Sequence, residues 1–430
     1  MKITISGIRG VFGDDLTPND VIKYCNNFTT LVKSKKCVIG YDTRPSSNIM
    51  MNNVVASLMQ CGIEVYNLGM VPTPVVFRES RKYGAGVMIT SSHNPIEWNG
   101  LKFIIDGRGL NEDELNIIKN NQTVDKSKIG TEKFIESNYV IDAINLVGSI
   151  KENPEVILDI GGGAAKNVAP EVLQKIGCNI KILNETQSNR GPDPTTDSLS
   201  DLTSECNKNQ IGFAYDLDGD RVVIVRNGKK LSSDATLGLG IAKAIELGYK
   251  KFVLSIDTSI AIEKYIKQNG CSVQRSKVGE ANVIDLMLQT NSEAGGEGSS
   301  AGFILSKFNF CRDGILTSAL VSSMLESKRF EDVIDLINEY YQFREKVKIE
   351  SKFHDKTMNE LKQSLQNEFD EISTVDGIKA IIDENSWVLV RKSNTEDSIR
   401  ISCESNNLEK TKQIQYDMVE LVKQCYAKIK

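Results

Sequence analysis

Residues 85–95 read Ala-Gly-Val-Met-Ile-Thr-Ser-Ser-His-Asn-Pro and place a serine beside one of the two histidines of the chain. The first five residues are apolar and partly β-branched, which predicts a buried strand over Ala85–Ile89. Ser92 then falls on the loop at the C-terminal end of this strand, where open α/β sheets bind ligands. Pro95 restricts the backbone of the residue before it and stiffens the loop. The same residues also favour turns, so a plain turn is the alternative interpretation.

A second motif reads Asp216-Leu217-Asp218-Gly219-Asp220-Arg221 and follows a strand-like run over residues 211–215. Three neighbouring carboxylates repel one another unless a cation neutralises them, and carboxylate oxygens suit Mg²⁺. Gly219 allows a turn that brings the carboxylates together. An EF-hand is excluded, because Gly219 precedes the third aspartate and the twelfth position is Asn227. A solvated acidic turn is the alternative.

Two further segments carry polar groups that suit a sugar and a phosphate. Residues 295–302 read Gly-Gly-Glu-Gly-Ser-Ser-Ala-Gly and offer a carboxylate and hydroxyls with little bulk to obstruct a polyol. Residues 391–400 read Arg-Lys-Ser-Asn-Thr-Glu-Asp-Ser-Ile-Arg and follow a predicted strand over residues 387–390. Guanidinium forks, hydroxyls and backbone N–H groups can together hold a phosphate. A plain glycine-rich linker and an exposed charged hairpin are the alternatives.

The composition is that of a globular protein without a nucleic-acid or membrane partner. The chain has 52 basic and 57 acidic residues, a net charge of −5, and no long basic block. Its nine cysteines are scattered without a Cys-x-x-Cys pair, which favours reduced, buried thiols. We find no apolar stretch of membrane-spanning length and no signal-peptide pattern at the N-terminus. The expected location is therefore the cytoplasm.

One structural unit occurs three times along the chain. Each copy contains a short apolar strand, a helical pattern, a glycine and a second strand. The first strands are expected at residues 37–40, 156–159 and 252–255. Such βαβ units favour parallel pairing, so the copies predict three related α/β domains.

In this order the four motifs resemble those of the α-D-phosphohexomutase superfamily. Its members carry a Thr-x-Ser-His-Asn-Pro serine loop, an Asp-x-Asp-Gly-Asp-Arg metal loop, a Gly-Glu-x-Ser sugar loop and an Arg-x-Ser-Asn-Thr-Glu phosphate loop. We use these four names for residues 90–95, 216–221, 295–302 and 391–400. The resemblance spans the whole chain, because it continues in three more segments: Ser6-Gly7-Ile8-Arg9-Gly10, Gly40-Tyr41-Asp42-Thr43-Arg44 and Asn99-Gly100-Leu101-Lys102.

The resemblance implies three related α/β domains with mixed sheets and a smaller C-terminal α+β domain around a central cleft. Polar stretches that interrupt the pattern set the expected boundaries. Domain I, with the serine loop, spans residues 1–135, and domain II, with the metal loop, spans residues 136–232. Domain III, with the sugar loop, spans residues 233–344, and domain IV, with the phosphate loop, spans residues 345–430.

The resemblance also implies a reaction. A phosphohexomutase moves phosphate between C6 and C1 of a hexose phosphate through an enzyme phosphoserine and a bisphosphorylated sugar. Ser92 is the expected phosphoserine, with Ser91 as the alternative. One Mg²⁺ per chain is expected on Ser92, Asp216, Asp218 and Asp220, and a sugar bisphosphate is the expected activator.

Further residues are expected to move protons or to bind the substrate. Three ionisable side chains are candidates for proton transfer or for charge stabilisation beside it: His93, Lys102 and Arg9. Six side chains with guanidinium, hydroxyl or amide groups are expected to bind phosphate: Arg221, Arg391, Ser393, Asn394, Thr395 and Arg400. Three are expected to approach the sugar: Glu297, Ser299 and Glu280. For Glu280, a surface acid at the start of a helix is the alternative.

The chain departs from many relatives at two positions. Bacterial members often continue the sugar loop with Gly-His, where this chain has Ser300-Ala301, so a histidine base from this loop is excluded. Relatives usually have Glu-Pro in the phosphate loop, where this chain has Glu396-Asp397. Loss of this proline removes a backbone constraint but no phosphate-binding side chain.

Three functions remain compatible with the motifs. The first is a phosphoglucosamine mutase, which interconverts glucosamine 6-phosphate and glucosamine 1-phosphate. The second is a phosphoglucomutase/phosphomannomutase, because residues 95–100 and 278–283 resemble archaeal-type members that occur under both names. The third is an inactive homologue that only binds sugar phosphates. Expected partners are a phosphosugar substrate and, as one option, a second copy of the chain in a homodimer.

Overall fold

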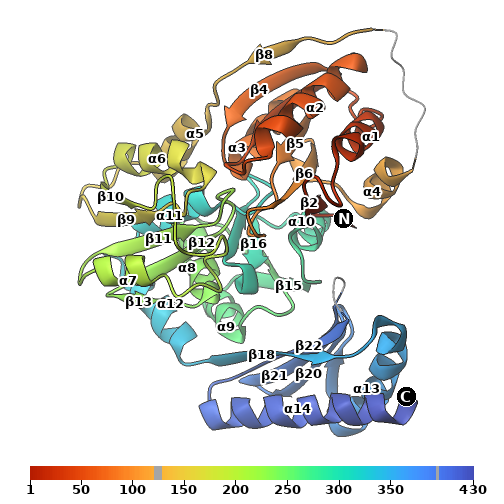
Figure 1. Cartoon of the computed structure of the whole chain (residues 1–430). Helices are drawn as coiled ribbons and strands as arrows, with labels where there is room; N and C mark the ends of the chain where they lie inside the picture. Colours follow the sequence, from red (N-terminus) through yellow and green to blue (C-terminus); the bar gives the residue numbers. More distant parts are fainter. Residues whose placement is uncertain (121–127, 394–396) are drawn as a thin grey trace.

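The structure is a computed structural model and describes residues 1–120, 128–393 and 397–430. Four sheets follow one another along this described part of the chain, and helices pack against each of them (Figure 1). The first three sheets combine parallel and antiparallel strand pairs, whereas every strand pair of the fourth sheet is antiparallel. The expected fold class is thereby confirmed. Within the described residues, no helix combines the length and the hydrophobicity that a membrane span needs.

Domain I is built on a sheet with the strand order β1-β2-β6-β5-β3-β4-β8, and β7 pairs with β6. Its strands are β1 (Lys2–Thr4), β2 (Gly7–Val11), β3 (Lys36–Tyr41), β4 (Glu64–Met70), β5 (Ala85–Ile89), β6 (Trp98–Ile105), β7 (Arg108–Gly109) and β8 (Glu132–Phe134). Its helices are α1 (Pro18–Phe28), α2 (Ser47–Gln60), α3 (Thr73–Tyr83) and α4 (Glu112–Lys119). β5 has the bounds expected from its apolar run, and all its residues are buried because it pairs on both edges inside a covered sheet.

Domain II has a sheet with the strand order β10-β9-β11-β12-β13. Its strands are β9 (Glu155–Asp159), β10 (Asn179–Leu183), β11 (Ile211–Tyr215), β12 (Val222–Arg226) and β13 (Lys229–Lys230). Its helices are α5 (Tyr139–Val147), the 3-10 helix Ala164–Asn167, α6 (Ala169–Lys175) and α7 (Ser200–Glu205). The metal loop joins the antiparallel strands β11 and β12, and Gly219 adopts a φ of +68° in it. This is the turn for which a glycine was expected.

Domain III has a sheet with the strand order β15-β14-β16-β17. Its strands are β14 (Lys251–Ser255), β15 (Ser272–Ser276), β16 (Ala294–Glu297) and β17 (Gly302–Leu305). Its helices are α8 (Ser233–Glu246), α9 (Ile260–Gln268), α10 (Glu280–Thr290), the 3-10 helix Gly298–Ser300, α11 (Gly314–Ser322) and α12 (Lys328–Asn338). The strand pairs β3–β4, β9–β10 and β14–β15 are all parallel, each with an intervening helix, which confirms the repeated unit.

Domain IV has a sheet with the strand order β18-β22-β21-β20-β19. Its strands are β18 (Tyr341–Lys348), β19 (Glu371–Ser373), β20 (Ile378–Asp383), β21 (Ser386–Lys392) and β22 (Ser398–Ser405). Its helices are the 3-10 helix Ser351–Phe353, α13 (His354–Glu368) and α14 (Leu408–Ile429). β18 leads into this domain, which lies below the other three in Figure 1. The domain boundaries expected from the sequence stay predictions.

The hydrophobic cores show which domains form one body. Domains II and III share a single core, in which Phe213 of β11 and Phe252 of β14 belong to the same cluster. Domain IV has a core of its own and contacts domain III through a small cluster of Ile256, Trp387 and Leu389. Because the core of domain IV is separate, this domain can move as a unit relative to domain III.

The cysteines contribute to the cores of all four domains. All nine are buried and none forms a disulfide, which confirms the expectation of reduced thiols. Burial raises the pKa of Cys178 to about 11, because an apolar surrounding disfavours the thiolate. Cys178 is therefore a packing group and not a nucleophile.

Candidate active site

The serine loop begins where β5 ends. Ser92 adopts a φ of +52°, in the left-handed region that side chains rarely occupy. Its backbone N–H donates to the hydroxyl oxygen of Thr90 at 2.8 Å, and this hydroxyl donates to Oδ2 of Asp42 at 2.6 Å. A strained residue persists only where its surroundings fix it, and such residues are concentrated at functional sites.

Arg44 holds the serine loop in place through hydrogen bonds to its backbone. Its guanidinium group donates to the carbonyl oxygens of Ser92, Asn94 and Trp98 at 2.6, 2.7 and 2.8 Å. Its Nε also donates to Asp42 at 3.1 Å, and both side chains of this ion pair are fully buried. The sequence analysis cited Arg44 only as part of a similar segment and assigned it no role. The sequence contained one signal for such a role, because the charged residues Asp42 and Arg44 directly follow the buried strand β3.

The three aspartates of the metal loop converge as expected. Their ligand atoms all lie within 4.8 Å of one another, and all three side chains are buried. Oδ1 of Asp218 and Oδ1 of Asp220 have no hydrogen-bond partner among the described residues. Buried, unpartnered carboxylate oxygens in one cluster fit a hard divalent cation. The cluster can therefore hold a metal ion.

Contacts between domains I and II bring the serine to this cluster. The hydroxyl of Ser92 donates to Oδ2 of Asp216 at 2.9 Å. Thr73, the first residue of α3, donates from its hydroxyl to Oδ2 of Asp218 at 2.6 Å and from its N–H to the carbonyl oxygen of Asp218 at 2.8 Å. Burial, and then the charge of Asp218, raises the pKa of Asp216 well above its usual value.

Lys102, in β6 of domain I, reaches the metal loop from the other side. Its Nζ donates to Oδ2 of Asp218 at 2.7 Å and to Oδ2 of Asp220 at 2.8 Å. Burial acts to lower the pKa of Lys102, but the two aspartates outweigh it and raise this pKa above its usual value. In this arrangement Lys102 is a cation that balances two carboxylates, and it can donate a proton but not accept one.

Three arginines lie around the cluster and present unused donors. The Nε atoms of Arg9, Arg221 and Arg312 are buried and have no acceptor among the described residues. Nη2 of Arg312 lies 3.0 Å from Oδ2 of Asp220. Buried guanidinium donors without acceptors fit an anion such as a phosphoryl group. Arg9 and Arg221 were expected here, whereas the sequence analysis missed Arg312.

His93 is the titratable group closest to the serine in the chain. Its Nδ1 lies 3.3 Å from Oγ of Ser92. Burial, and then the charge of Arg221, lowers the pKa of His93 to about 2. The imidazole is therefore neutral at pH 7 and is a weak base in this cationic surrounding.

The sugar-loop residues meet around Arg312. Oε1 of Glu297 accepts the N–H of Gly279 at 2.6 Å, and Oε2 lies 3.6 Å from Nη1 of Arg312. Oε1 of Glu280 accepts the backbone N–H of Arg312 at 2.8 Å, so the Glu280 carboxylate is held inside the molecule and is not a surface acid. Ser299 is partly exposed in the same loop. Burial raises the pKa of Glu297.

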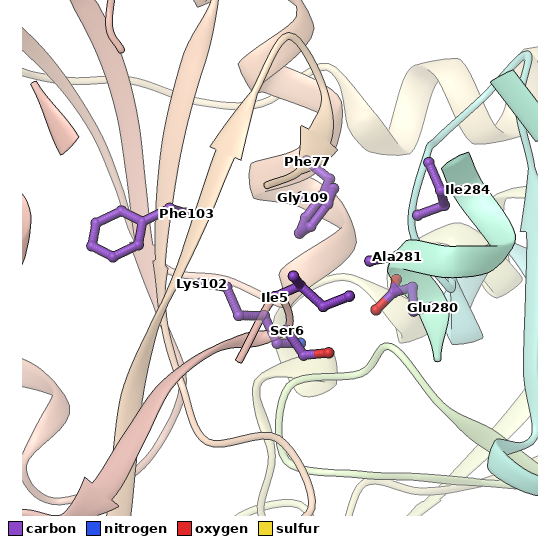
Figure 2. Close-up of a pocket in the computed structure, with 9 residues that line it drawn as sticks. All are labelled: Ile5, Ser6, Phe77, Lys102, Phe103, Gly109, Glu280, Ala281 and Ile284. Carbon is purple, nitrogen blue, oxygen red and sulfur yellow. The ribbon is translucent and has the colours of Figure 1, made fainter. Parts of the chain in front are cut away.

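A small cavity joins this cluster to domain I. It has a volume of about 30 Å³ and is lined by Lys102 of domain I and Glu280 of domain III. Ser6 and Ile5, from the N-terminal segment, lie between them (Figure 2). One expected sugar-binding residue, Glu280, and one expected proton-transfer residue, Lys102, therefore face a common space between the two domains.

The phosphate loop lies on domain IV. Arg391 in β21 and Arg400 in β22 are direct partners across the antiparallel pair, which places both guanidinium groups on one face of the hairpin. The N–H of Ser393 donates to the carbonyl oxygen of Ser398 at 3.0 Å, at the base of the loop. Asn394 and Thr395, the other expected phosphate ligands, lie outside the described residues.

Two buried side chains, from β22 and β20, fasten domain IV to domain III. The carboxylate of Glu404 accepts the N–H of Ile260 at 2.8 Å and Nε1–H of Trp387 at 2.5 Å, so it caps the start of α9. Nζ of Lys379 donates to the carbonyl oxygen of Ile256 at 2.7 Å. Sequence reasoning did not find this contact, because its members lie in separate elements.

Comparison with known proteins agrees with the site. The family models of phosphoglucomutase/phosphomannomutase match all four parts of the chain. The alpha/beta/alpha domains I, II and III match residues 1–128, 133–229 and 232–343, and the C-terminal domain matches residues 346–421.

Individual relatives match along almost the whole chain. A protein of Methanothermobacter thermautotrophicus named "Probable phosphoglucosamine mutase" is 32% identical over 95% of this chain and 95% of its own. A "Phosphoglucomutase/phosphomannomutase" of Thermococcus kodakarensis is 30% identical over 95% of both chains. The crystal structure of a phosphoglucomutase/phosphomannomutase family protein from Burkholderia thailandensis has the same fold, with a TM-score of 0.84 at 21% identity over 99% of this chain and 98% of its own.

The fold, the serine next to an acidic triad and these relatives define an isomerase of the intramolecular phosphotransferase class. The chain belongs to the phosphoglucomutase/phosphomannomutase family. It is thus a phosphohexomutase, and the α-D-phosphohexomutase resemblance drawn from the sequence is confirmed.

Proposed function

We propose that this phosphohexomutase is a phosphoglucosamine mutase, which interconverts glucosamine 6-phosphate and glucosamine 1-phosphate. The observation that carries the phosphoryl-transfer site is the hydroxyl of Ser92, 2.9 Å from Asp216 in a buried triad of aspartates. The name of the relative from Methanothermobacter thermautotrophicus, at 32% identity, supports glucosamine as the sugar.

Ser92 is the proposed phosphoserine. In the first half-reaction its Oγ–P bond breaks and a P–O bond forms to the sugar hydroxyl, which loses a proton while Ser92 Oγ gains one. The second half-reaction returns the other phosphoryl group of the bisphosphorylated sugar to Ser92. One Mg²⁺ per chain would be held by Asp216, Asp218 and Asp220 and by an oxygen of the Ser92 phosphate, and it would offset charge on the transferred group.

The cationic side chains divide into two proposed groups. Arg9 and Arg221 lie beside the triad with unpartnered Nε atoms and would bind the transferred phosphoryl group. Arg391 and Arg400, with Ser393, would bind the other phosphate from domain IV. Asn394 and Thr395 belong to the same proposed phosphate site but lie outside the described residues.

His93 and Lys102 are the proposed proton-transfer residues, although in the substrate-free site the lowered pKa of His93 makes it a weak base and the raised pKa of Lys102 makes it a weak acid. Glu297, Ser299 and Glu280 are the proposed sugar contacts. Ring hydroxyls that glucose and mannose share would bind Glu297 and Ser299 equally well.

The sugar preference is tested by steady-state kinetics with glucosamine 1-phosphate, glucose 1-phosphate and mannose 1-phosphate. The highest kcat/KM is expected for glucosamine 1-phosphate. A higher value for either other sugar would favour the second candidate, a phosphoglucomutase/phosphomannomutase, which the relative from Thermococcus kodakarensis supports. Absence of turnover with all three would leave the inactive sugar-phosphate-binding homologue, against which the complete triad and Ser92 argue.

Several finer expectations belong to the same proposal. A sugar bisphosphate is the proposed activator, because it can supply the phosphoryl group that first loads Ser92. The net charge of −5 supports a function without nucleic acid. The cytoplasm is the proposed location, without a membrane partner. A homodimer is the oligomeric option, and the mass measured by light scattering tests it.

A further inference from the structure

One carboxylate links the phosphate loop to domain III. Oδ2 of Asp376, in the turn between β19 and β20, lies 3.0 Å from Nε of Arg391. The same oxygen accepts the backbone N–H of Val278, in domain III, at 3.0 Å. A single oxygen therefore contacts a proposed phosphate ligand of domain IV and the backbone of the neighbouring domain.

The contact continues to the sugar loop. Gly279 follows Val278 directly, and its N–H donates to Oε1 of Glu297 at 2.6 Å. Asp376 and Glu297 are thus joined to adjacent peptide groups. Only the φ and ψ dihedrals of Val278 separate these two peptide groups, so this short backbone segment is the path by which a shift of one carboxylate can reach the other.

The turn that carries Asp376 is pressed against Arg391. Gly377 adopts a φ of +77°, and a Cβ at this position would lie 2.7 Å from Cγ of Arg391 and 2.2 Å from the carbonyl oxygen of Val390. Only a glycine allows this close approach. The arginine is thus confined along its stem and forms an ion pair with Asp376, but its Nε–H makes no hydrogen bond among the described residues.

Asp376 and Arg391 line a cavity of about 420 Å³, together with Lys277 and Val278 of domain III and Ile5 of domain I. The cavity is thus bounded by three domains. Glu404 and Lys379 fasten domain IV to domain III, and Asp376 adds a further contact between these domains beside the cavity.

We propose that Asp376 is a positioning residue that orients Arg391 and couples the phosphate loop to the sugar loop across the junction of domains III and IV. This inference rests on the proposed function, because it concerns the same substrate site. It assigns to Asp376 no contact with the substrate.

Two substitutions of Asp376 distinguish its contact with Arg391 from its contact with Val278. Asp376→Asn keeps an acceptor for the N–H of Val278 but removes the charge that holds Arg391. Asp376→Ala removes both links. Loss of an ion pair that involves no hydrogen bond typically weakens an interaction by up to about fivefold. We expect Asp376→Asn to raise KM about fivefold for every phosphosugar with kcat changed less than about twofold.

Asp376→Ala should raise KM at least as much and should also change the ratio of kcat/KM between glucosamine 1-phosphate and glucose 1-phosphate. In Asp376→Asn this ratio should stay at the wild-type value. The double variant Asp376→Asn with Arg391→Ala should show the KM of Arg391→Ala alone, because the charge of Asp376 acts through Arg391. If Asp376 only supported the fold, its substitution would raise KM further in the Arg391→Ala background.

Asp383→Asn is the matched control. Asp383 also lies in domain IV and pairs with a cation, Lys410, but does not contact the phosphate loop. This variant should have the KM of the wild type. Thermal unfolding of each variant verifies the fold.

Calorimetric titration with glucosamine 6-phosphate gives a readout that is independent of turnover. Weaker binding to Asp376→Asn than to the wild type supports the coupling even if the chain turns over no sugar, in which case only the proposed mutase function fails. Unchanged or tighter binding would overturn the coupling, because tighter binding means that Asp376 competes with phosphate for Arg391. Absence of binding to the wild type would overturn both proposals.

Discussion

The hydroxyl oxygen of Ser92 lies 2.9 Å from Oδ2 of Asp216, although the two residues are 124 positions apart in the chain. Domain I supplies the serine and domain II supplies the carboxylate. Thr73 of domain I fixes the distance between them through its two hydrogen bonds to Asp218. The site therefore depends on how two domains pack, and each of its parts can be tested separately.

Ser92→Ala should abolish mutase activity without loss of the fold, because a loop hydroxyl contributes little packing energy. Ser91→Ala is the matched control, since its hydroxyl contacts Asn94 and not the metal loop, and this variant should stay active. Peptide mapping of protein purified from cells should locate a phosphate on Ser92. A phosphate on Ser91 together with an active Ser92→Ala variant would reverse the assignment.

Chelation of divalent metals should abolish turnover, and added Mg²⁺ should restore it. Asp218→Asn should raise the Mg²⁺ concentration needed for half-maximal activity at least about a hundredfold, since even residues behind metal ligands cost roughly 10- to 100-fold. Asp201→Asn, an exposed aspartate of α7, should behave like the wild type. Full activity after exhaustive chelation would exclude a catalytic metal at the triad.

Arg400→Ala should raise KM roughly ten- to a hundredfold for every phosphosugar, because one charge-assisted hydrogen bond is lost from substrate binding. The rank order of the sugars should not change. Lys392→Ala is the control, because this neighbouring cation pairs with Asp355 on the exposed side of the hairpin. An unchanged KM in Arg400→Ala would mean that the hairpin is only an exposed turn.

Glu297→Gln should instead change the ratio of kcat/KM between glucosamine 1-phosphate and the other two sugars, but not the ratio between glucose 1-phosphate and mannose 1-phosphate, whose shared hydroxyls it would contact equally. Glu297 lies in the loop that would contact ring hydroxyls, and its carboxylate is already fixed by Gly279 and Arg312. The measurement is the ratio of kcat/KM for the three sugar 1-phosphates. Equal losses for all three would assign Glu297 to the support of the loop and not to sugar choice.

Lys379 should make the stability of the protein depend on pH. Burial lowers its pKa from 10.5 to about 7. Between these values the unfolded chain holds a proton that the native state has released, so the free energy of unfolding increases as the pH rises. We expect a gain of about 2 kcal/mol from pH 7 to pH 9.

Lys379→Met should lack this gain, whereas Lys410→Met, which removes an exposed cation of the same domain, should keep it. Urea unfolding at the two pH values, followed by tryptophan fluorescence, provides the comparison. Equal pH dependence in Lys379→Met and the wild type would show that Lys379 keeps its proton in the native state.

Local patterns predicted the elements that carry the motifs. β5 and β11 have the predicted bounds, because short apolar runs between polar turns show buried strands directly. The aspartate triad could also be predicted from the sequence, since its three ligands lie in one loop and need only a turn at Gly219 to converge. In both cases the deciding interactions are close in sequence.

Residues that act between domains could not be found in this way. Arg312 binds Asp220, Glu280 and Glu297, and each partner comes from a different segment. The sequence around Arg312 offered one signal, the aspartate at position 313, which caps α11. That signal indicates a helix start and says nothing of an arginine in the site. Lys102 was predicted to be near the chemistry, but its ion pairs with the aspartates required the packed domains.

The burial of every cysteine gives each domain a chemical reporter of its own. A thiol that is shielded in the native state reacts with an aqueous alkylating reagent only while its surroundings are open. Cys25, Cys178, Cys271 and Cys403 are buried in domains I, II, III and IV, respectively. The alkylation rates of these four peptides, read by mass spectrometry from one sample, would therefore give the order in which the domains open.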